Sequence, residues 1–292
     1  MSKGLLDPKV DFVFKNIFGS PNHPEILISF LNATLKAKKK IVNVDIKKTD
    51  IEKQYIEDKY SRLDVKATTS NDEIINIEIQ LKNENNMVKR SLYYLSKMYE
   101  EQLNEKEDYS KLVRTVCINI LNFKYLKTDN FHTGYRFKEI ESNEELTDIM
   151  EVHFIEIPKL QDSSDEKDML VAWTEFLKDP ESEKVRGLEL SIEEIRQAKD
   201  ELIRMSNDST QRELYDMRAN SLRDKMSELN AAERKGIEKG REEGREEGRK
   251  EGIEEGRKEE KIEIVRNMKL SGLDTNTIAK ITNLSEDEID KL

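Results

Sequence analysis

The sequence predicts an α/β fold in which a mixed central sheet is flanked by helices and followed by a helical C-terminal arm. Apolar residues in the first 160 positions alternate between a period of two, typical of strands, and helical spacing. Beyond Pro158 only helical spacing remains. A glycine then stands at every fourth position from Gly236 to Gly256 within a charged run. We therefore expect a globular domain, a helical extension, a charged helix or spacer and a small helical tail, at residues 1–160, 161–232, 233–261 and 262–292.

Two helices are predicted at the start of the chain. In the segment LLDPKVDFVFKNIFG, Asp7 suits the N-cap, Pro8 suits the first helical position, and Gly19 suits a left-handed residue after the last turn. A second helix is expected at 24–35, where apolar residues recur at helical spacing. Each helix has one apolar face, which should point toward the core.

Five strands are predicted from alternation or from continuous apolar runs, at residues 41–46, 62–68, 73–81, 111–123 and 151–157. The segment TSND at 69–72 is a hairpin-type turn, so the second and third strands should be antiparallel neighbours. An amphipathic helix is expected at 86–103, directly after the third strand. Strands and helices in this order predict a mixed sheet with helices against it.

The glycine-rich segment is predicted to be a partner-dependent helix or a spacer. Four residues turn an α-helix by roughly 400°, so the glycines spiral around the helix and form no straight seam. Its six interior glycines cost on the order of 5 kcal/mol relative to alanine. Each Glu–Arg pair along the helix returns only about 0.2–0.5 kcal/mol. We expect the arm to gain stability from a partner, and a homo-oligomer formed through this arm is our expectation.

The tail at 262–292 has the outline of a helix-turn-helix unit. Ser285 and Glu288 have the spacing of a capping box for its last helix. That helix is short and carries four acidic residues, which are Glu286, Asp287, Glu288 and Asp290. Acidic side chains repel phosphate, so we expect a protein contact or a degenerate module rather than a helix that reads a DNA groove.

Composition excludes several classes of protein. Among 292 residues there is one cysteine, Cys117, so an intrachain disulfide framework is excluded and a reducing cytoplasm is expected. The three histidines lack metal-ligand spacing, and no apolar run is long enough for a membrane span. The net charge of -11 argues against general adhesion to nucleic acid. The lysine-rich segment at 36–48 is either a solvated edge or a local phosphate-contacting face.

Two predicted neighbouring strands each carry an acid within an apolar run. Asp64 lies in the strand at 62–68 and Glu78 in the strand at 73–81, with Gln80 and then Lys82 following Glu78 at strand spacing. If the hairpin pairs as its turn suggests, Asp64 and Glu78 can converge and repel unless a cation lies between them. Hard oxygen ligands suit Mg²⁺ or Mn²⁺, and such an ion can promote phosphodiester hydrolysis. Alternatively, these acids line the wet face of a half-exposed sheet.

The pattern D-x(n)-E-x-[K/Q] across a hairpin resembles the core of the PD-(D/E)XK nuclease superfamily. The segments DPKVDFVFKNIFG, LDVKA, NIEIQ and KRSLYYLSKMYEEQL, together with the glycine repeat, resemble the recombination-promoting nucleases, also described as PD-(D/E)XK family transposases. The resemblance implies a restriction-endonuclease-like fold and a metal held by Asp64 and Glu78. It implies further site residues in Gln80, in the first-helix pair Asp11 and Lys15, and in the post-strand pair Arg90 and Tyr94.

The chain departs from the wider superfamily at Gln80, where a catalytic lysine is usual. An amide can orient water or phosphate, but it carries no charge. Four lysines remain as possible sources of that charge, which are Lys15, Lys66, Lys82 and Lys89. Arg90 has a second interpretation, as an ion-pair partner of Glu78 or of a neighbouring acid.

The resulting hypothesis is a Mg²⁺-dependent DNA endonuclease of low sequence specificity, linked to recombination, mobile elements or defence. The alternative is a catalytically inactive nuclease fold that serves as a protein-interaction or dimerisation module. The set of Asp64, Glu78 and Gln80 favours the enzyme, because an inactive scaffold has no physical reason to keep it. A complete transposase is less well supported, since the sequence lacks a basic recognition surface.

Overall fold

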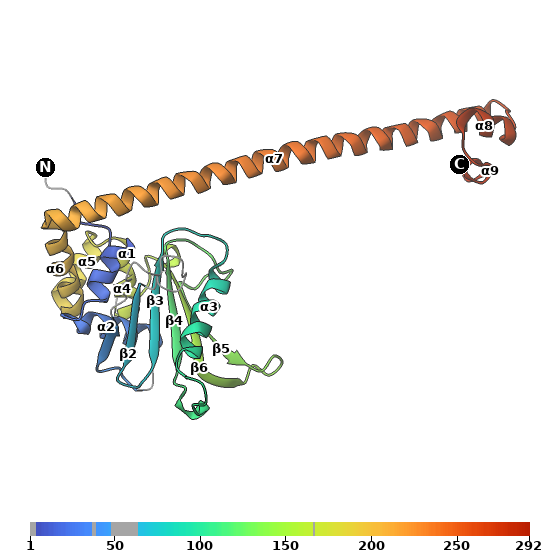
Figure 1. Ribbon diagram of the computed structural model, residues 1–292. Helices are drawn as coiled ribbons and strands as arrows, with labels where there is room; N and C mark the ends of the chain where they lie inside the picture. Colours follow the sequence, from blue (N-terminus) through green and yellow to red (C-terminus); the bar gives the residue numbers. More distant parts are fainter. Residues whose placement is uncertain (1–3, 37–38, 48–63, 166) are drawn as a thin grey trace. The chain divides into compact units, whose positions relative to one another are not determined.

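The computed structural model describes residues 4–36, 39–47, 64–165 and 167–292. The chain forms two compact units, Met1–Leu222 and Arg223–Leu292. The first unit contains a single mixed sheet with helices on both faces (Figure 1). The predicted fold class is therefore confirmed.

The sheet has six strands in the order β1-β2-β3-β4-β6-β5. Their bounds are β1 Val44–Lys47, β2 Val65–Thr69, β3 Ile74–Gln80, β4 Thr115–Leu121, β5 His132–Lys138 and β6 Glu145–Glu156. Strands β1, β2 and β3 form an antiparallel meander, in which the pairing of β2 with β3 is the one that the turn at 69–72 predicted. Strands β3, β4 and β6 are parallel, and β5 pairs antiparallel with β6 at the edge. The first two positions of the predicted strand at 62–68 lie outside the described residues.

Strand β5 was not predicted from the sequence. No residue of this strand is buried, because it lies at the edge of the sheet. An edge strand needs no apolar alternation, and its pairing with β6 also shifts register after Tyr135. Its existence thus depends on the neighbouring strand rather than on its own side chains.

Helices cover the two faces of the sheet unequally (Figure 1). One face packs against the larger hydrophobic core, which draws on α1 Asp11–Phe18, α2 Pro24–Leu35, α4 Met169–Lys178, α5 Glu183–Ser191 and α6 Glu193–Asn207. The other face packs against α3 Met87–Glu100 and a smaller core. Along β3, Ile75, Ile77 and Ile79 belong to the larger core. The intervening side chains of β3 therefore point toward the α3 side.

The start of α1 differs from the prediction. The helix begins at Asp11, and Asp7 instead closes a turn, in which its Oδ1 accepts a hydrogen bond of 2.9 Å from Lys9 N. Gly19 is not left-handed, since its φ is -101°. A Cβ at Gly19 would lie 2.6 Å from the Lys15 carbonyl oxygen and 3.3 Å from Val65 Cγ2. Glycine is needed there for a close approach between α1 and the sheet, not for a positive φ.

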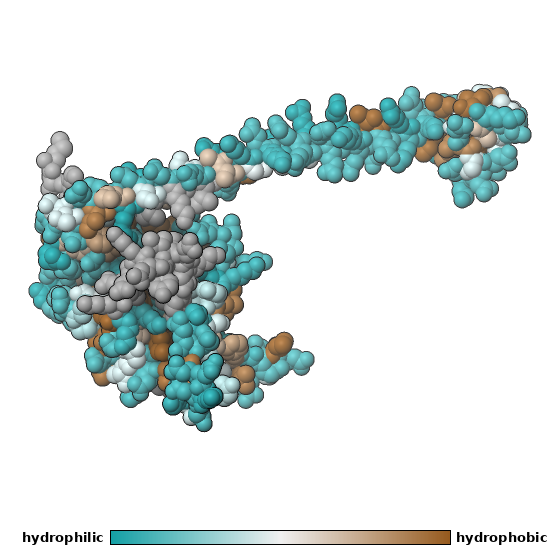
Figure 2. Space-filling view, viewed as in Figure 1, coloured by the Kyte–Doolittle hydropathy of each residue, from teal (hydrophilic) through white to brown (hydrophobic). Residues whose placement is uncertain are grey.

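The glycine repeat lies within one helix, α7 Ser209–Leu270. Its surface is almost entirely hydrophilic (Figure 2), and i,i+4 ion pairs such as Glu254–Lys258 at 2.9 Å run along it. In the second unit, the end of α7 packs with α8 Thr275–Thr282 and α9 Glu286–Asp290 around a small apolar core. The predicted capping box of Ser285 and Glu288 is present. No helix in the described part of the chain is long and apolar enough to cross a membrane.

Candidate active site

The hairpin of β2 and β3 brings Asp64 and Glu78 to one place. Val65 pairs with Ile77 in the antiparallel hairpin, and Asp64 lies in the bend directly before β2. Asp64 Oδ2 accepts a hydrogen bond of 2.8 Å from the backbone N of Ile79, the residue after Glu78. The Glu78 charge also acts on Asp64 and helps to raise its pKa, so the two acids lie close together.

Burial makes both carboxyl groups weak acids. Glu78 is only 1% exposed, and burial raises its pKa to about 7. Burial also raises the pKa of Asp64 to about 8, and the nearby charges of Glu78 and Asp11 add to that shift. Acids with such pKa values hold their protons near neutral pH, and a nearby cation would favour their charged forms and lower both pKa values.

Arg90 lies above these acids on α3. Its Nη2 is 3.3 Å from Glu78 Oε2, and its Nη1 donates a hydrogen bond of 3.4 Å to Gln80 Oε1. The guanidinium also lies over the Tyr94 ring, 5.4 Å from the ring centre, one helical turn away. Burial alone would lower the Arg90 pKa, but attraction to Glu78, together with Tyr94, Glu84 and Asp64, outweighs it and the pKa is raised. Arg90 therefore remains a cation within the site.

Several buried polar atoms at this site have no hydrogen-bond partner among the described residues. They are both carboxylate oxygens of Glu78, both amide atoms of Asn76 and the Nε of Arg90. Asn76 lies beside Glu78, is fully buried, and lowers the Glu78 pKa slightly against the effect of burial. Unsatisfied buried polar atoms are uncommon in folded proteins and usually mark a bound ion, ordered water or a catalytic role.

The two acids fit a divalent cation. Mg²⁺ usually takes one or two protein carboxylates and fills its remaining positions with water and substrate phosphate. Asp64 and Glu78 supply that number, and the unpaired oxygens of Glu78 are suitable ligands. No cluster of three or more His, Cys, Asp or Glu side chains able to hold an ion exists within the described ranges. A cation here would therefore depend on these two acids and on the substrate.

Other predicted residues lie at varying positions around this pair. Asp11 is near enough to raise the Asp64 pKa, and its Oδ2 is 2.8 Å from Arg218 Nη1. Tyr94 is buried beneath Arg90. Lys15 lies on α1, half-buried and engaged in contacts of its own.

The strand-spacing argument for Lys82 was wrong. Strand β3 ends at Gln80, so alternation does not extend to Lys82, which lies in a bend and makes other contacts. Lys66 is on β2 with Nζ 3.8 Å from a Glu101 carboxylate oxygen, and Lys89 is exposed on α3. Arg90 is thus the basic residue whose contacts with both Glu78 and Gln80 are established.

Two site residues were missed from the sequence. Asn76 is two positions before Glu78, so the alternation already used for Glu78 and Gln80 could have placed it on the same face. Arg218 had no such signal, because it reaches Asp11 across 207 residues of chain.

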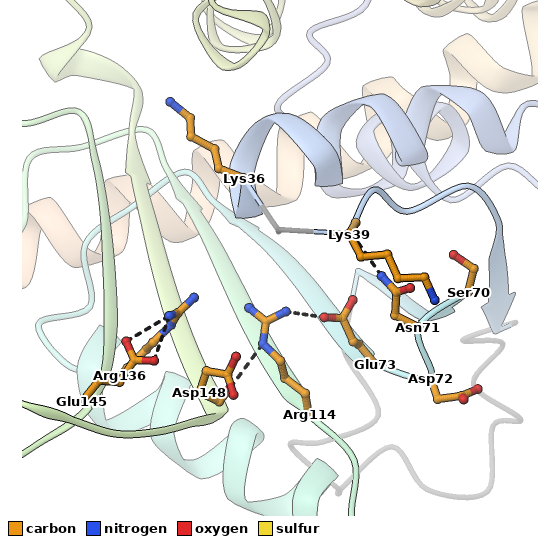
Figure 3. Close-up of a pocket in the computed structure, with 10 residues that line it drawn as sticks. All are labelled: Lys36, Lys39, Ser70, Asn71, Asp72, Glu73, Arg114, Arg136, Glu145 and Asp148. Carbon is orange, nitrogen blue, oxygen red and sulfur yellow. Dashed lines mark hydrogen bonds and ion pairs between the residues drawn. The ribbon is translucent and has the colours of Figure 1, made fainter.

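A second group of charged residues lies at the opposite end of the sheet. A hollow of about 630 Å³ is lined there by residues from the α2 end, the β2–β3 turn and the starts of β4 and β6 (Figure 3). Arg114 donates to Glu73 and Glu151, and its Nε donates to the Asp148 carbonyl oxygen at 3.2 Å. Glu73 precedes Glu78 by five residues, which is roughly 17 Å along a strand. The hollow is therefore separate from the acid pair.

A chain of hydrogen bonds continues from that group to the sheet edge. His153 Nε2 lies 2.7 Å from Glu151 Oε1, and His153 Nδ1 lies 2.9 Å from His132 Nε2. Burial would raise the Glu151 pKa, but the bonds from His153 and Arg114 outweigh it and hold the pKa at about 2. Burial lowers the His132 pKa to about 4. This network is well paired, unlike the acid pair under α3.

Comparisons with known proteins support the resemblance read from the sequence. Residues 8–232 match the family model described as PD-(D/E)XK nuclease family transposase. Residues 258–292 match the model of the Rpn/YhgA-like nuclease family, C-terminal HTH domain. No match was found among curated proteins or among solved structures. The first family model covers well over half of the chain, and the predicted resemblance is confirmed. The protein therefore belongs to the PD-(D/E)XK nuclease family transposases.

Proposed function

We propose that this protein is a metal-dependent DNA endonuclease that hydrolyses phosphodiester bonds with low sequence specificity. The observation that carries the proposal is the buried, adjacent pair of Asp64 and Glu78. Both Glu78 carboxylate oxygens lack hydrogen bonds among the described residues, and one of them forms an ion pair of 3.3 Å with the Arg90 guanidinium. The family assignment supports nuclease chemistry in general. The metal requirement and the endonucleolytic mode are our proposals.

Each residue has a distinct task in this proposal. Asp64 and Glu78 hold Mg²⁺ or Mn²⁺, and such an ion polarises a phosphate and lowers the pKa of bound water. The Asp64–Ile79 hydrogen bond keeps the first acid aimed at the ion. Gln80 and Tyr94 hold the Arg90 guanidinium from two sides. We propose that Asp11, Lys15 and Lys82 contact the DNA backbone or position the groups that do.

Low sequence specificity follows from the charge of the C-terminal unit. Its last helix begins with Glu286, Asp287 and Glu288, which would repel the phosphates beside a DNA groove. The C-terminal match to a helix-turn-helix domain supports a role in DNA binding. We propose that this unit adds affinity or a protein contact, without reading bases.

We further propose that the chain forms a homo-oligomer through its C-terminal arm. Leu270 and Ile281 are large apolar residues of the second unit that are 85% and 58% exposed. Contact with a second copy would cover such side chains and offset the weak helix propensity of the glycine repeat. Light scattering of the full chain and of a Leu270→Glu, Ile281→Glu variant tests this, and equal masses at monomer size would refute it.

The setting that we propose is the cytoplasm, where cleavage would act in recombination, in the movement of mobile elements or in defence. The single buried cysteine is consistent with a reducing compartment.

Plasmid nicking tests the enzymatic proposal. Supercoiled plasmid is incubated with Mg²⁺ and with wild type, Asp64→Ala or the matched control Asp45→Ala, which removes an exposed carboxylate on β1. We expect wild type and Asp45→Ala to nick equally, and Asp64→Ala to lose nicking with an unchanged melting temperature. Equal, weak nicking by all three proteins would indicate a contaminating nuclease and would refute the enzyme.

An inactive scaffold is the second candidate function, and one observation favours it. With pKa values of about 8 and 7, Asp64 and Glu78 can remain protonated and uncharged near neutral pH without a cation. A catalytically inactive fold could keep both acids buried in this protonated, uncharged form. Calorimetric titration with Ca²⁺ separates the candidates. The enzyme should bind Ca²⁺, and Asp64→Ala should abolish that binding, whereas an inactive scaffold needs no such site.

A further inference from the structure

The proposed nuclease site lacks the lysine that related nucleases place after the second acid. Gln80 occupies that position and carries no charge. Phosphodiester hydrolysis gathers negative charge on the phosphate, so a cation aimed at that phosphate stabilises the transition state. The positive charge must therefore come from another residue that reaches the end of β3.

Arg90 reaches this position from the neighbouring helix. Its guanidinium makes contacts with Glu78 and with Gln80 at 3.3 Å and 3.4 Å, so it lies directly at the end of β3. Gln80 Oε1 is a hydrogen-bond acceptor, which suits the Arg90 guanidinium as a donor. A lysine at position 80 would instead repel that guanidinium. The side chain of Arg90 is 22% exposed, so it can be reached by a ligand from solvent.

The surroundings of Arg90 keep the guanidinium in place while leaving donors available. The Tyr94 ring supports it from below, and the Arg90 Nε is buried without a hydrogen bond among the residues that the structure describes. A guanidinium presents five N–H donors in a planar fork that matches phosphate oxygens. Two of its nitrogens are engaged by Glu78 and Gln80.

We propose that Arg90 supplies the positive charge that the superfamily lysine supplies elsewhere, with Gln80 as its anchor. Before a cation binds, the guanidinium neutralises Glu78. A cation bound to the Glu78 carboxylate would free the Arg90 nitrogen that contacts Glu78. This nitrogen would then contact a non-bridging oxygen of the scissile phosphate. This inference rests on the nuclease function proposed above.

The chemistry assigned to Arg90 involves no proton transfer. In the hydrolysis, a water oxygen forms a new bond to phosphorus and the bond from phosphorus to the leaving sugar oxygen breaks. One proton of the water passes to the leaving oxygen. Arg90 stays protonated throughout, because a guanidinium does not lose its proton in proteins, and it only offsets the charge on the phosphate oxygens.

Rescue by a transplanted lysine provides the main test. We compare wild type, Arg90→Met, Gln80→Lys and the double variant in Mg²⁺-dependent plasmid nicking. We expect Arg90→Met to lose about a hundred-fold or more in rate. The double variant should nick at least about ten-fold faster than Arg90→Met, because the lysine at position 80 returns a cation to the same place. The control is Lys97→Met, which removes a partly exposed cation from the same helix and should stay within about three-fold of wild type.

DNA affinity gives a readout that does not depend on turnover. Binding of a short duplex is measured with Ca²⁺ in place of Mg²⁺ at several salt concentrations. The slope of log affinity against log salt should fall by about 0.9 in Arg90→Met, which corresponds to one lost phosphate contact. Lys97→Met should keep the wild-type slope if it lies outside the DNA path.

The outcomes separate this inference from the nuclease proposal. If wild type nicks and Arg90→Met nicks at nearly the same rate with the same salt slope, the role of Arg90 is refuted and the nuclease stands. If Arg90→Met is inactive and the double variant, folded by its melting curve, gains nothing, the shared position of the two cations is refuted. If Arg90→Met does not fold, Arg90→Gln takes its place, and nicking by folded Arg90→Gln at nearly the wild-type rate refutes the role of Arg90. Absence of nicking by wild type refutes the nuclease itself.

Discussion

The two ends of the central sheet both gather charged residues on neighbouring strands, but they differ in how these are paired. At the start of β4, Arg114 donates to Glu73 and to Glu151, and Glu151 also contacts His153 and Arg136. The pKa of Glu151 is held at about 2, because these partners stabilise its charged form against the effect of burial. These ion pairs and hydrogen bonds stabilise the sheet at this end.

The other end, under α3, is left incompletely paired. Glu78 is as buried as Glu151, yet both of its oxygens lack hydrogen bonds from the described residues, and its pKa is raised to about 7. Its Arg90 partner is shared with Gln80. Two glutamates that are both shielded from solvent therefore carry opposite pKa shifts, because Glu78 lies deeper in the protein and Glu151 has more hydrogen-bond partners. The difference indicates that only the end under α3 is prepared for a ligand that brings positive charge.

The largest expected effect is on activity at the end under α3. Asp64→Asn keeps an acceptor for Ile79 N but removes the negative charge, so nicking should fall about a thousand-fold. The free energy of unfolding in EDTA should not fall, because the variant also removes a carboxylate that burial disfavours. Nicking assays and thermal melting of the same preparation measure both. A clear loss of stability in Asp64→Asn would contradict the comparison.

The second effect is on stability at the paired end. Glu151→Gln breaks a buried ion pair, and the free energy of unfolding should fall by about 3 kcal/mol. That corresponds to roughly 6–12 °C in melting temperature for a domain of this size. Nicking at a temperature where the variant remains folded should stay within about three-fold of wild type. Loss of nicking by folded Glu151→Gln would show that the two ends are coupled.

The third effect is a pH dependence that comes from the raised pKa values. The folded state holds protons on Asp64 up to about pH 8 and on Glu78 up to about pH 7, whereas in the unfolded chain both titrate near pH 4. Stability from these groups is fully present below about pH 4 and is lost as the pH rises to about 8. In EDTA these two pKa shifts correspond to a loss on the order of 6 kcal/mol in the free energy of unfolding between pH 5 and pH 8.

Melting curves in EDTA and in Ca²⁺ measure that pH dependence. Ca²⁺ should restore stability at pH 8, because it binds the ionised acids. The double variant Asp64→Asn, Glu78→Gln should show a flatter pH profile and no response to Ca²⁺. If wild type and the double variant have the same pH profile, the raised pKa values of Asp64 and Glu78 are refuted.

The smallest effect compares two buried asparagines on the α3 face. Asn119 accepts from Ser91 Oγ at 2.9 Å and donates to the His153 carbonyl oxygen at 3.0 Å, whereas Asn76 lacks partners among the described residues. Both substitutions by alanine leave similar cavities. Asn119→Ala should therefore be less stable than Asn76→Ala by about 1 kcal/mol, the contribution of its hydrogen bonds. Denaturant unfolding measures this difference, and equal stabilities would mean that Asn76 is paired in solution.

Sequence reasoning succeeded where the site is local. Turn residues and alternation predicted the hairpin on which Glu78 and Gln80 lie, with Asp64 directly before its first strand, whereas Arg90 was predicted only from the resemblance to a family. The same reasoning failed at Lys82, because alternation holds only while a strand continues and β3 ends at Gln80. It could not find β5, whose edge position requires no apolar pattern.

The sequence by itself determined the order of the elements, the two faces of β3 and the meeting of two acids, because periodicity and turn residues act over a few positions. Only the tertiary structure decided which partners those acids have. The Asp11–Arg218 pair and the Glu151–His153–His132 row join residues far apart in the chain, and a spacing pattern carries no information on such pairings. The pKa of each acid follows from these partners and from burial, and both are properties of the folded chain.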